Sequence, residues 1–195
     1  MAKYAIISAL AALVCAVDLE IAHEEIHHTT EITYTVRYDA NWFDEIQHVF
    51  ARGADALALD LQTGREFYIR RTFGHNHADV EPLTTCDAQI INEIWGGHSW
   101  ARRPVLIFVE NYAFAGSLTN FPHAGRDDAP ATAVVNNRSG GYGRGVNLDA
   151  VKDNGVCGVI CLHFAGSLLH GSNRSNPCHQ AAVAEAQEAL KAIDN

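Results

Sequence analysis

Several stretches of the chain alternate between apolar and polar positions, or form short apolar runs, as strands do. Residues 31–38 alternate and are rich in β-branched and aromatic side chains. Residues 56–61 and 66–71 flank a turn at Gln62-Thr63-Gly64, which predicts a β-hairpin. Further strands are predicted at residues 104–109, 113–118 and 159–164, and the first two of these form a second hairpin.

Apolar side chains recur at helical spacing in other parts of the chain. The short first helix stops near Gly53. The second has a capping residue in Thr84 or Thr85 and ends at Gly96-Gly97. The helices are therefore predicted at residues 42–50, 86–95 and 181–193.

Residues 124–155 are rich in Gly, Asn, Asp and Arg and have little hydrophobic pattern, which predicts a long loop. The 195 residues suffice for one well-buried core, and a second full domain would be a tight fit. The prediction is a single α+β domain over residues 29–195. Antiparallel β-hairpins form its body, with flanking helices and a C-terminal helix.

Residues 1–28 form a separate apolar N-terminal segment. Lys3 precedes an apolar run over residues 4–16, and Val14-Cys15-Ala16 has the small residues of a signal-peptide cleavage site. The run is shorter than the roughly 20 apolar residues of a membrane span, so no stable span is expected. We predict export, to the cell envelope or the extracellular space. The alternative is an N-terminal helix used in packing or assembly.

The charge balance narrows the range of partners. Lys and Arg number 14 against 23 Asp and Glu, which gives a net charge of −9. Because the basic residues form no dense run, no nucleic-acid partner is expected.

The cysteines fit export. Cleavage after residue 16 would remove Cys15 and leave four thiols, enough for two disulfides. A bridge between Cys157 and Cys178 is expected to fix the loop after the last strand, with Cys161 free in the strand itself. The paired Cys-x-x-Cys units of a structural zinc site are absent from the sequence.

Residues 158–180 concentrate the side chains best suited to chemistry. Cys and His serve in nucleophilic attack, in proton transfer near neutral pH and in metal ligation. Packing alone rarely requires this many Cys and His side chains close together, so the cluster indicates a reactive site. Its members are Cys161, His163, His170, Cys178 and His179.

Four ordered groups of motifs resemble a family of mostly uncharacterised exported or cell-wall-associated bacterial proteins. The likeness covers roughly residues 46–190 and implies a cell-wall peptide or glycan as the partner. The motifs are Leu57-Ala-Leu-Asp-Leu-Gln-Thr-Gly-Arg-Glu-Phe, His77-Ala-Asp-Val-Glu-Pro-Leu, Trp100-Ala-Arg-Arg-Pro-Val, and Cys161-Leu-His-Phe followed by Ser167, His170 and His179-Gln180.

A more distant likeness is to the L,D-transpeptidase signature, in which a His-Gly and a later Ser-x-Gly-Cys strand supply the acylated thiol. By this resemblance Cys161 is the nucleophile, His123 the base, and His163 an orienting or assisting group on the same strand face. The remaining candidates, for substrate binding, are Arg103, Ser117 and His170. No cofactor is needed for cysteine acyl transfer on peptidoglycan peptides.

The sequence departs from that signature at two places. The pattern typically has Gly directly after the histidine, where this chain has Ala124 before Gly125. It also typically has His where this chain has Val159. Either change is compatible with a degenerate site.

Two other classes of function stay open. A metal-dependent amidase or peptidase, with zinc as the cofactor, would draw its ligands from an Asp and several imidazoles. A non-catalytic surface or assembly protein, forming a homo-oligomer or polymer, would have the same fold without a working active site. The metal candidates are His77, Asp79, His163, His170 and His179.

Overall fold

The computed structural model describes residues 4–5 and 33–194. The expected signal peptide or assembly helix over residues 1–28 lies outside the described residues, apart from two that form a short strand. The strands are β1 Tyr4–Ala5, β2 Thr33–Val36, β3 Asp55–Asp60, β4 Glu66–Phe73, β5 Ala78–Pro82, β6 Ser99–Val109, β7 Tyr112–Asn120, β8 His123–Ala124, β9 Val134–Arg138, β10 Gly143–Val146 and β11 Gly158–His163. The helical segments are η1 Trp42–Ile46 (π), α1 Gln47–Val49, α2 Thr85–Trp95, η2 Ser139–Gly141 (3₁₀) and α3 Pro177–Asp194.

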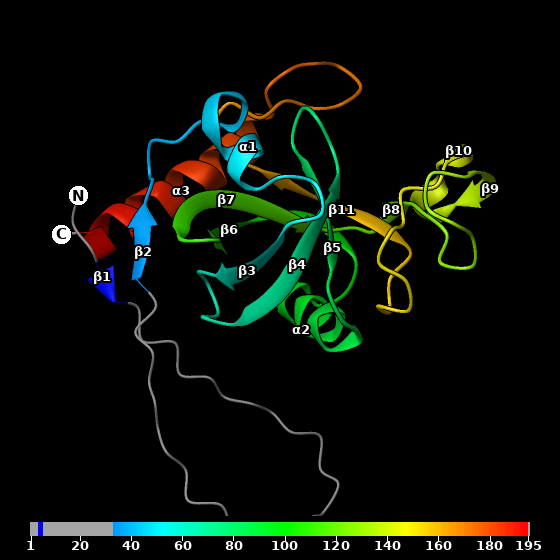
Figure 1. Cartoon of the computed structure of the whole chain (residues 1–195), viewed down its shortest axis with the longest axis horizontal. Coiled ribbons are helices and arrows are strands. Elements are labelled where there is room, and N and C mark those ends of the chain that lie inside the picture. Colours follow the sequence, from blue (N-terminus) through cyan, green and yellow to red (C-terminus); the bar gives the residue numbers. More distant parts are fainter. Residues whose placement is uncertain (1–3, 6–32, 195) are drawn as a thin grey trace, which may run out of the picture.

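Both expected hairpins are present, as the antiparallel pairs β3–β4 and β6–β7. They do not stand as separate hairpins, however. Six strands close into a barrel in the order β7-β6-β3-β4-β5-β11, and β11 returns to pair with β7 (Figure 1). Of the six barrel strands, the one that the sequence pattern missed is β5, which lies in the stretch between the hairpin and α2. Without β5 the barrel could not reach β11.

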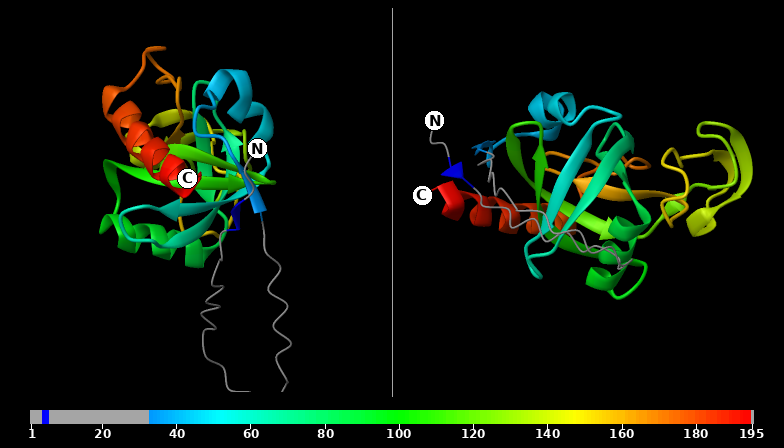
Figure 2. Two further views of the ribbon diagram at one scale, coloured as in Figure 1. Left: turned by 90° about the vertical axis from the view of Figure 1, so that its left-hand side faces the viewer. Right: turned by 60° about the horizontal axis from the view of Figure 1, so that its bottom comes forward.

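Two apolar clusters, one on each side of β6, explain why the second half of this strand is buried on both faces. Val105 and Ile107 belong to the main core. Leu106 and Phe108 face outward and pack against Ala186 and Leu190 of α3, along with other residues. The C-terminal helix therefore lies against the outside of β6 and β7 (Figure 2).

The helix α2 begins and ends as its sequence predicts. Thr84 is the N-cap, and its side chain and that of Asp87 form a capping box. Gly96 is the C-cap in the left-handed conformation. Asp87 also accepts a hydrogen bond from the backbone N–H of Tyr68, which ties α2 to β4.

The segment 124–155 is more ordered than the expected loop. It contains the two-stranded sheet of β9 and β10, which extends from one end of the barrel (Figures 1 and 2). In the described part of the chain, no helix has both the length and the apolar character that crossing a membrane requires.

Candidate functional site

The candidate site lies on the outer face of β11. Side chains alternate along a strand, and Ile160 and Leu162 belong to the main core. Cys161 and His163 therefore point to the opposite face, as the sequence predicts for a pair two residues apart. Both side chains are nevertheless buried.

The neighbouring strands add their own polar residues to this face. Residues directly opposite in an antiparallel pair share a face of the sheet. Asp79 of β5 pairs with Cys161, and Ser117 of β7 pairs with His163. His123 of β8 pairs with Val159, two residues before the cysteine. The barrel thus gathers on one face residues that the sequence separates widely.

Cys161 and His123 form a thiol–imidazole pair. The Sγ atom of Cys161 lies 3.9 Å from Nε2 of His123. Nδ1 of the same ring lies 2.9 Å from the backbone carbonyl of Phe121. Because a carbonyl oxygen can only accept, Nδ1 carries the proton and Nε2 of the neutral ring presents its lone pair to the thiol. This is the tautomer that a general base requires.

Both members of the pair are neutral at rest. Burial raises the pKa of the Cys161 thiol, and the nearby Asp79 carboxylate raises it further. Burial also lowers the pKa of His123 below its ordinary value of 6.5. Both shifts favour the neutral pair, with the proton on sulfur, over a thiolate–imidazolium pair.

Two exposed aromatic rings flank His123. The ring of Trp100 lies 5.4 Å from that of His123, and the ring of Tyr142 lies 4.9 Å from it. Trp100 also stacks on Phe121, whose carbonyl orients the imidazole. Tyr142 comes from the 124–155 segment, so this insertion covers part of the site. No sequence signal pointed to Tyr142, because its neighbours are typical of a loop.

Four imidazoles form a continuous stack beside the thiol. The ring of His77 lies 4.0 Å from those of His170 and His163, and His163 lies 3.8 Å from His179. His163, the candidate assisting group, is buried inside this stack. Neither of its ring nitrogens has a hydrogen-bond partner among the described residues. Burial, with the other imidazoles, holds the pKa of His163 far below 6.5, so its ring is neutral.

The other end of the stack is held by Ser117, one of the candidate substrate-binding residues. Its Oγ lies 2.9 Å from Nδ1 of His179, and the side chain is fully buried. Burial lowers the pKa of His179 to about 3. Ser117 therefore orients a neutral imidazole rather than facing a substrate.

Three of the five metal candidates come together. His77, Asp79 and His170 each offer a donor atom, and these atoms all lie within 4.8 Å of one another. Burial favours the neutral acid of Asp79, but the contacts with His170 and His77 outweigh it and hold the pKa well below 3.8. Among the described residues, His163 and His179 join no such group.

Arg103, another of the candidate substrate-binding residues, binds a carboxylate away from the site. Its guanidinium forms two hydrogen bonds, of 2.8 and 2.7 Å, with the buried carboxylate of Asp60. The neighbouring Arg102 is exposed, and its charge lowers the pKa of both Cys161 and His179. Arg102 is therefore the cation that faces the site, and alternation along β6 separates the two arginines.

The expected disulfide between Cys157 and Cys178 is wrong. Four cysteines of the described residues, Cys86, Cys157, Cys161 and Cys178, are free. Cys157 directly precedes β11, whereas Cys178 adjoins His179, which stacks on the last residue of that strand. The length of β11, about 20 Å at 3.3 Å per residue, separates them. A disulfide requires Cα atoms within roughly 7 Å.

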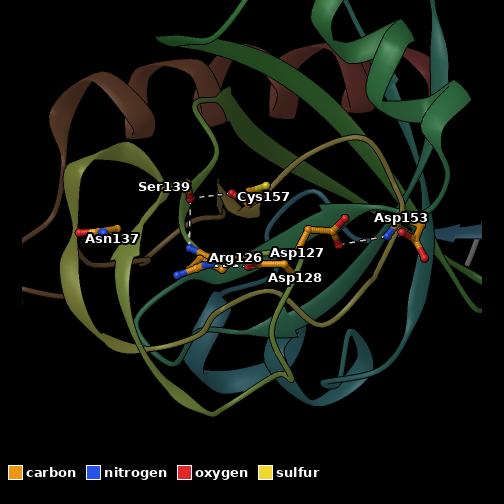
Figure 3. Close-up of a pocket in the computed structure, with 8 residues that line it drawn as sticks. Arg126, Asp127, Asp128, Asn137, Ser139, Asp153 and Cys157 are labelled. Atoms are coloured by element: carbon orange, nitrogen blue, oxygen red, sulfur yellow. Dashed lines mark hydrogen bonds and ion pairs between the residues drawn. The ribbon is translucent and has the colours of Figure 1, made fainter.

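A pocket lined mainly by polar residues lies next to the site, between the 124–155 segment and the start of β11 (Figure 3). Ser139 donates a hydrogen bond to the carbonyl of Cys157, and an Asp127 carboxylate accepts the N–H of Asp153. Arg126 pairs with Asp128. Of these contacts, the hydrogen bond from Ser139 ties the 124–155 segment to the chain that enters β11, and the other two lie within the segment.

Ala124 occupies the place where the resembled signature has Gly, and its φ is 60°. That left-handed conformation costs a non-glycine residue about 1–2 kcal/mol. Ala124 therefore adopts the backbone conformation that favours glycine.

Comparison with family models, with curated proteins and with solved structures found no match to this chain.

Proposed function

We propose that this protein is a cysteine acyltransferase of the cell envelope, with Cys161 as the nucleophile and His123 as the general base. The observation that carries the proposal is the pair itself. Nε2 of His123, in the tautomer fixed by the Phe121 carbonyl, lies 3.9 Å from the sulfur. Contacts of this kind are often long without substrate and shorten in the reacting complex.

The first half of the reaction would acylate the thiol. As Sγ attacks the carbonyl carbon of a peptide bond, His123 takes the thiol proton at Nε2. The tetrahedral intermediate then collapses, the C–N bond breaks, and the imidazolium donates its proton to the leaving amine. Cys161 is left as a thioester and His123 is neutral again.

The second half would transfer the acyl group. An incoming amine loses a proton to His123 and attacks the thioester carbon, and the sulfur leaves and is reprotonated by the imidazolium. Water in place of the amine would give hydrolysis. The resemblance supports peptidoglycan peptides as the substrates, and the exposed guanidinium of Arg102 is placed to attract a peptide carboxylate.

The pH dependence of the reaction should follow from the two neutral groups. Protonated His123 cannot accept a proton, and its pKa lies below 6.5. The acid limb of kcat/KM should therefore fall below pH 6.5. Because the pKa of Cys161 is raised, its alkylation by iodoacetamide should be slower at pH 7 than that of the exposed Cys178, and should still be rising at pH 9. Fast alkylation of Cys161 that is already constant at pH 6 would instead indicate a preformed ion pair.

Trapping of the thioester tests the proposal. The protein would be incubated with a peptidoglycan stem peptide, quenched in acid and mapped by mass spectrometry. We expect the mass of the acyl fragment on the peptide that contains Cys161, in the wild type and in Cys178→Ala. Acylation of another residue, or transfer without acylation of Cys161, would contradict the proposed mechanism.

A further inference from the structure

His77, Asp79 and His170 bring two imidazoles and a carboxylate to one point beside the thiol. His77 directly precedes β5, Asp79 is the second residue of that strand, and His170 comes from the segment that follows β11. Nε2 of His170 lies 3.2 Å from both carboxylate oxygens of Asp79. Nε2 of His77 lies 3.3 Å from Oδ1 of the same carboxylate.

One ring nitrogen of His77 is buried without a hydrogen-bond partner among the described residues. Nδ1 of His77 lies 2.8 Å from the backbone carbonyl of Leu168, so this nitrogen must carry the proton. The other ring nitrogen, Nε2, faces the Asp79 carboxylate. Among the described residues it has no hydrogen-bond partner, and His77 is only 2% exposed. A buried ring nitrogen without a partner is costly, and one that faces a carboxylate is well placed to ligate a cation.

The two nitrogen-to-carboxylate distances match those between neighbouring ligands of a bound metal ion. Zinc binds imidazole nitrogen and carboxylate oxygen at about 2.0–2.2 Å, which places neighbouring donors of a tetrahedral site on the order of 3.3 Å apart. Both nitrogen-to-carboxylate distances agree with this value. The His77 N–H bonded to a backbone carbonyl is also the usual outer contact of a metal-ligating histidine.

We propose that His77, Asp79 and His170 bind one divalent transition-metal ion of the zinc class. The side chain of His170 is 42% exposed, so the ion would be open to solvent on that side and would keep a position for water or another ligand. By joining β5 to the segment that carries His170, the ion fastens that segment to the barrel. The site does not depend on acyl transfer by Cys161.

The test is zinc titration of the full chain by calorimetry, with thermal unfolding in the presence and absence of zinc. The wild type should bind one Zn²⁺ at this site, and zinc should raise its Tm by several degrees. Asp79→Asn and His170→Ala should each weaken binding by at least about 100-fold, because loss even of outer contacts costs 10–100-fold. The exposed His48 lies outside the cluster, and His48→Ala should bind as the wild type does.

Two further measurements test whether a cysteine is a ligand of the ion. Cys161→Ser should abolish acyl transfer but retain the zinc site, which separates failure of this inference from failure of the proposed function. Bound Co²⁺ should show d–d absorption without a thiolate charge-transfer band. The inference is overturned if the wild type binds no Zn²⁺, if binding survives both Asp79→Asn and His170→Ala, or if it is lost in Cys161→Ser. Because His170 is partly exposed, His170→Ala remains informative even if Asp79→Asn does not fold.

Discussion

Replacement of Cys161 by alanine should lower the rate of acyl transfer by at least about 10⁴-fold, because no covalent intermediate can then form. His123→Gln should lower it by about 10²–10⁴-fold, the usual contribution of a positioned general base. The amide of glutamine can fill part of the space but cannot take the thiol proton. Rates measured with a peptide donor and an amine acceptor test both expectations.

The double variant shows whether the two residues act as one unit. If His123 serves only to deprotonate Cys161, the double variant should be no slower than Cys161→Ala alone. Cys178→Ala, which removes an exposed thiol, is the matched control and should retain the wild-type rate. Normal transfer by His123→Gln would exclude His123 as the base, and normal transfer by Cys161→Ala would exclude the thioester.

Gly158→Ala should disrupt the strand pairing that holds the base beside the thiol. Gly158 opens β11 with a φ of 90° and pairs with Ala124 of β8. A Cβ there would lie 2.2 Å from the backbone carbonyl oxygen of His123. Because that atom is backbone, the two strands must separate. We expect a loss of stability of about 3 kcal/mol in urea unfolding. Transfer should also fall at least 10-fold, since a shift of about 1 Å can cost 10²-fold.

Gly53→Ala separates the effect of close contact from that of backbone strain. Gly53 also has a φ of 90°, but a Cβ there would meet no atom within 4 Å. Its replacement should cost about 1–2 kcal/mol and leave transfer unchanged. If Gly158→Ala and Gly53→Ala behave alike in both measurements, the contact with His123 does not position the base.

The local elements were predictable because local patterns specify them. The hairpins β3–β4 and β6–β7, the cap of α2 at Thr84 and its end at Gly96 all follow from neighbouring residues. The alternation in β3 did not show which side faces the core. Ala56 and Ala58 point inward, whereas Leu57 and Leu59 pack outside with the cluster under α3.

The candidate site was predictable only in part. The sequence indicated Cys161 and His123, and the structure brings them together although 38 positions separate them. For substrate binding the sequence indicated Arg103, whereas the exposed arginine is its neighbour Arg102. That difference depends on Asp60, which lies on another strand and binds Arg103. The expected disulfide was wrong for the same reason, since nearness in sequence hid the length of β11 between the two cysteines.

By itself, the sequence determined the strand alternation that puts Cys161 and His163 on one face, because that period of two is a property of the local backbone. The tertiary structure alone decided which residues of other strands lie beside Cys161 and His163. Closure of the barrel sets the register that places Asp79 opposite Cys161 and Ser117 opposite His163. Such pairings depend on the packing of whole strands around a shared core, and no single segment encodes them.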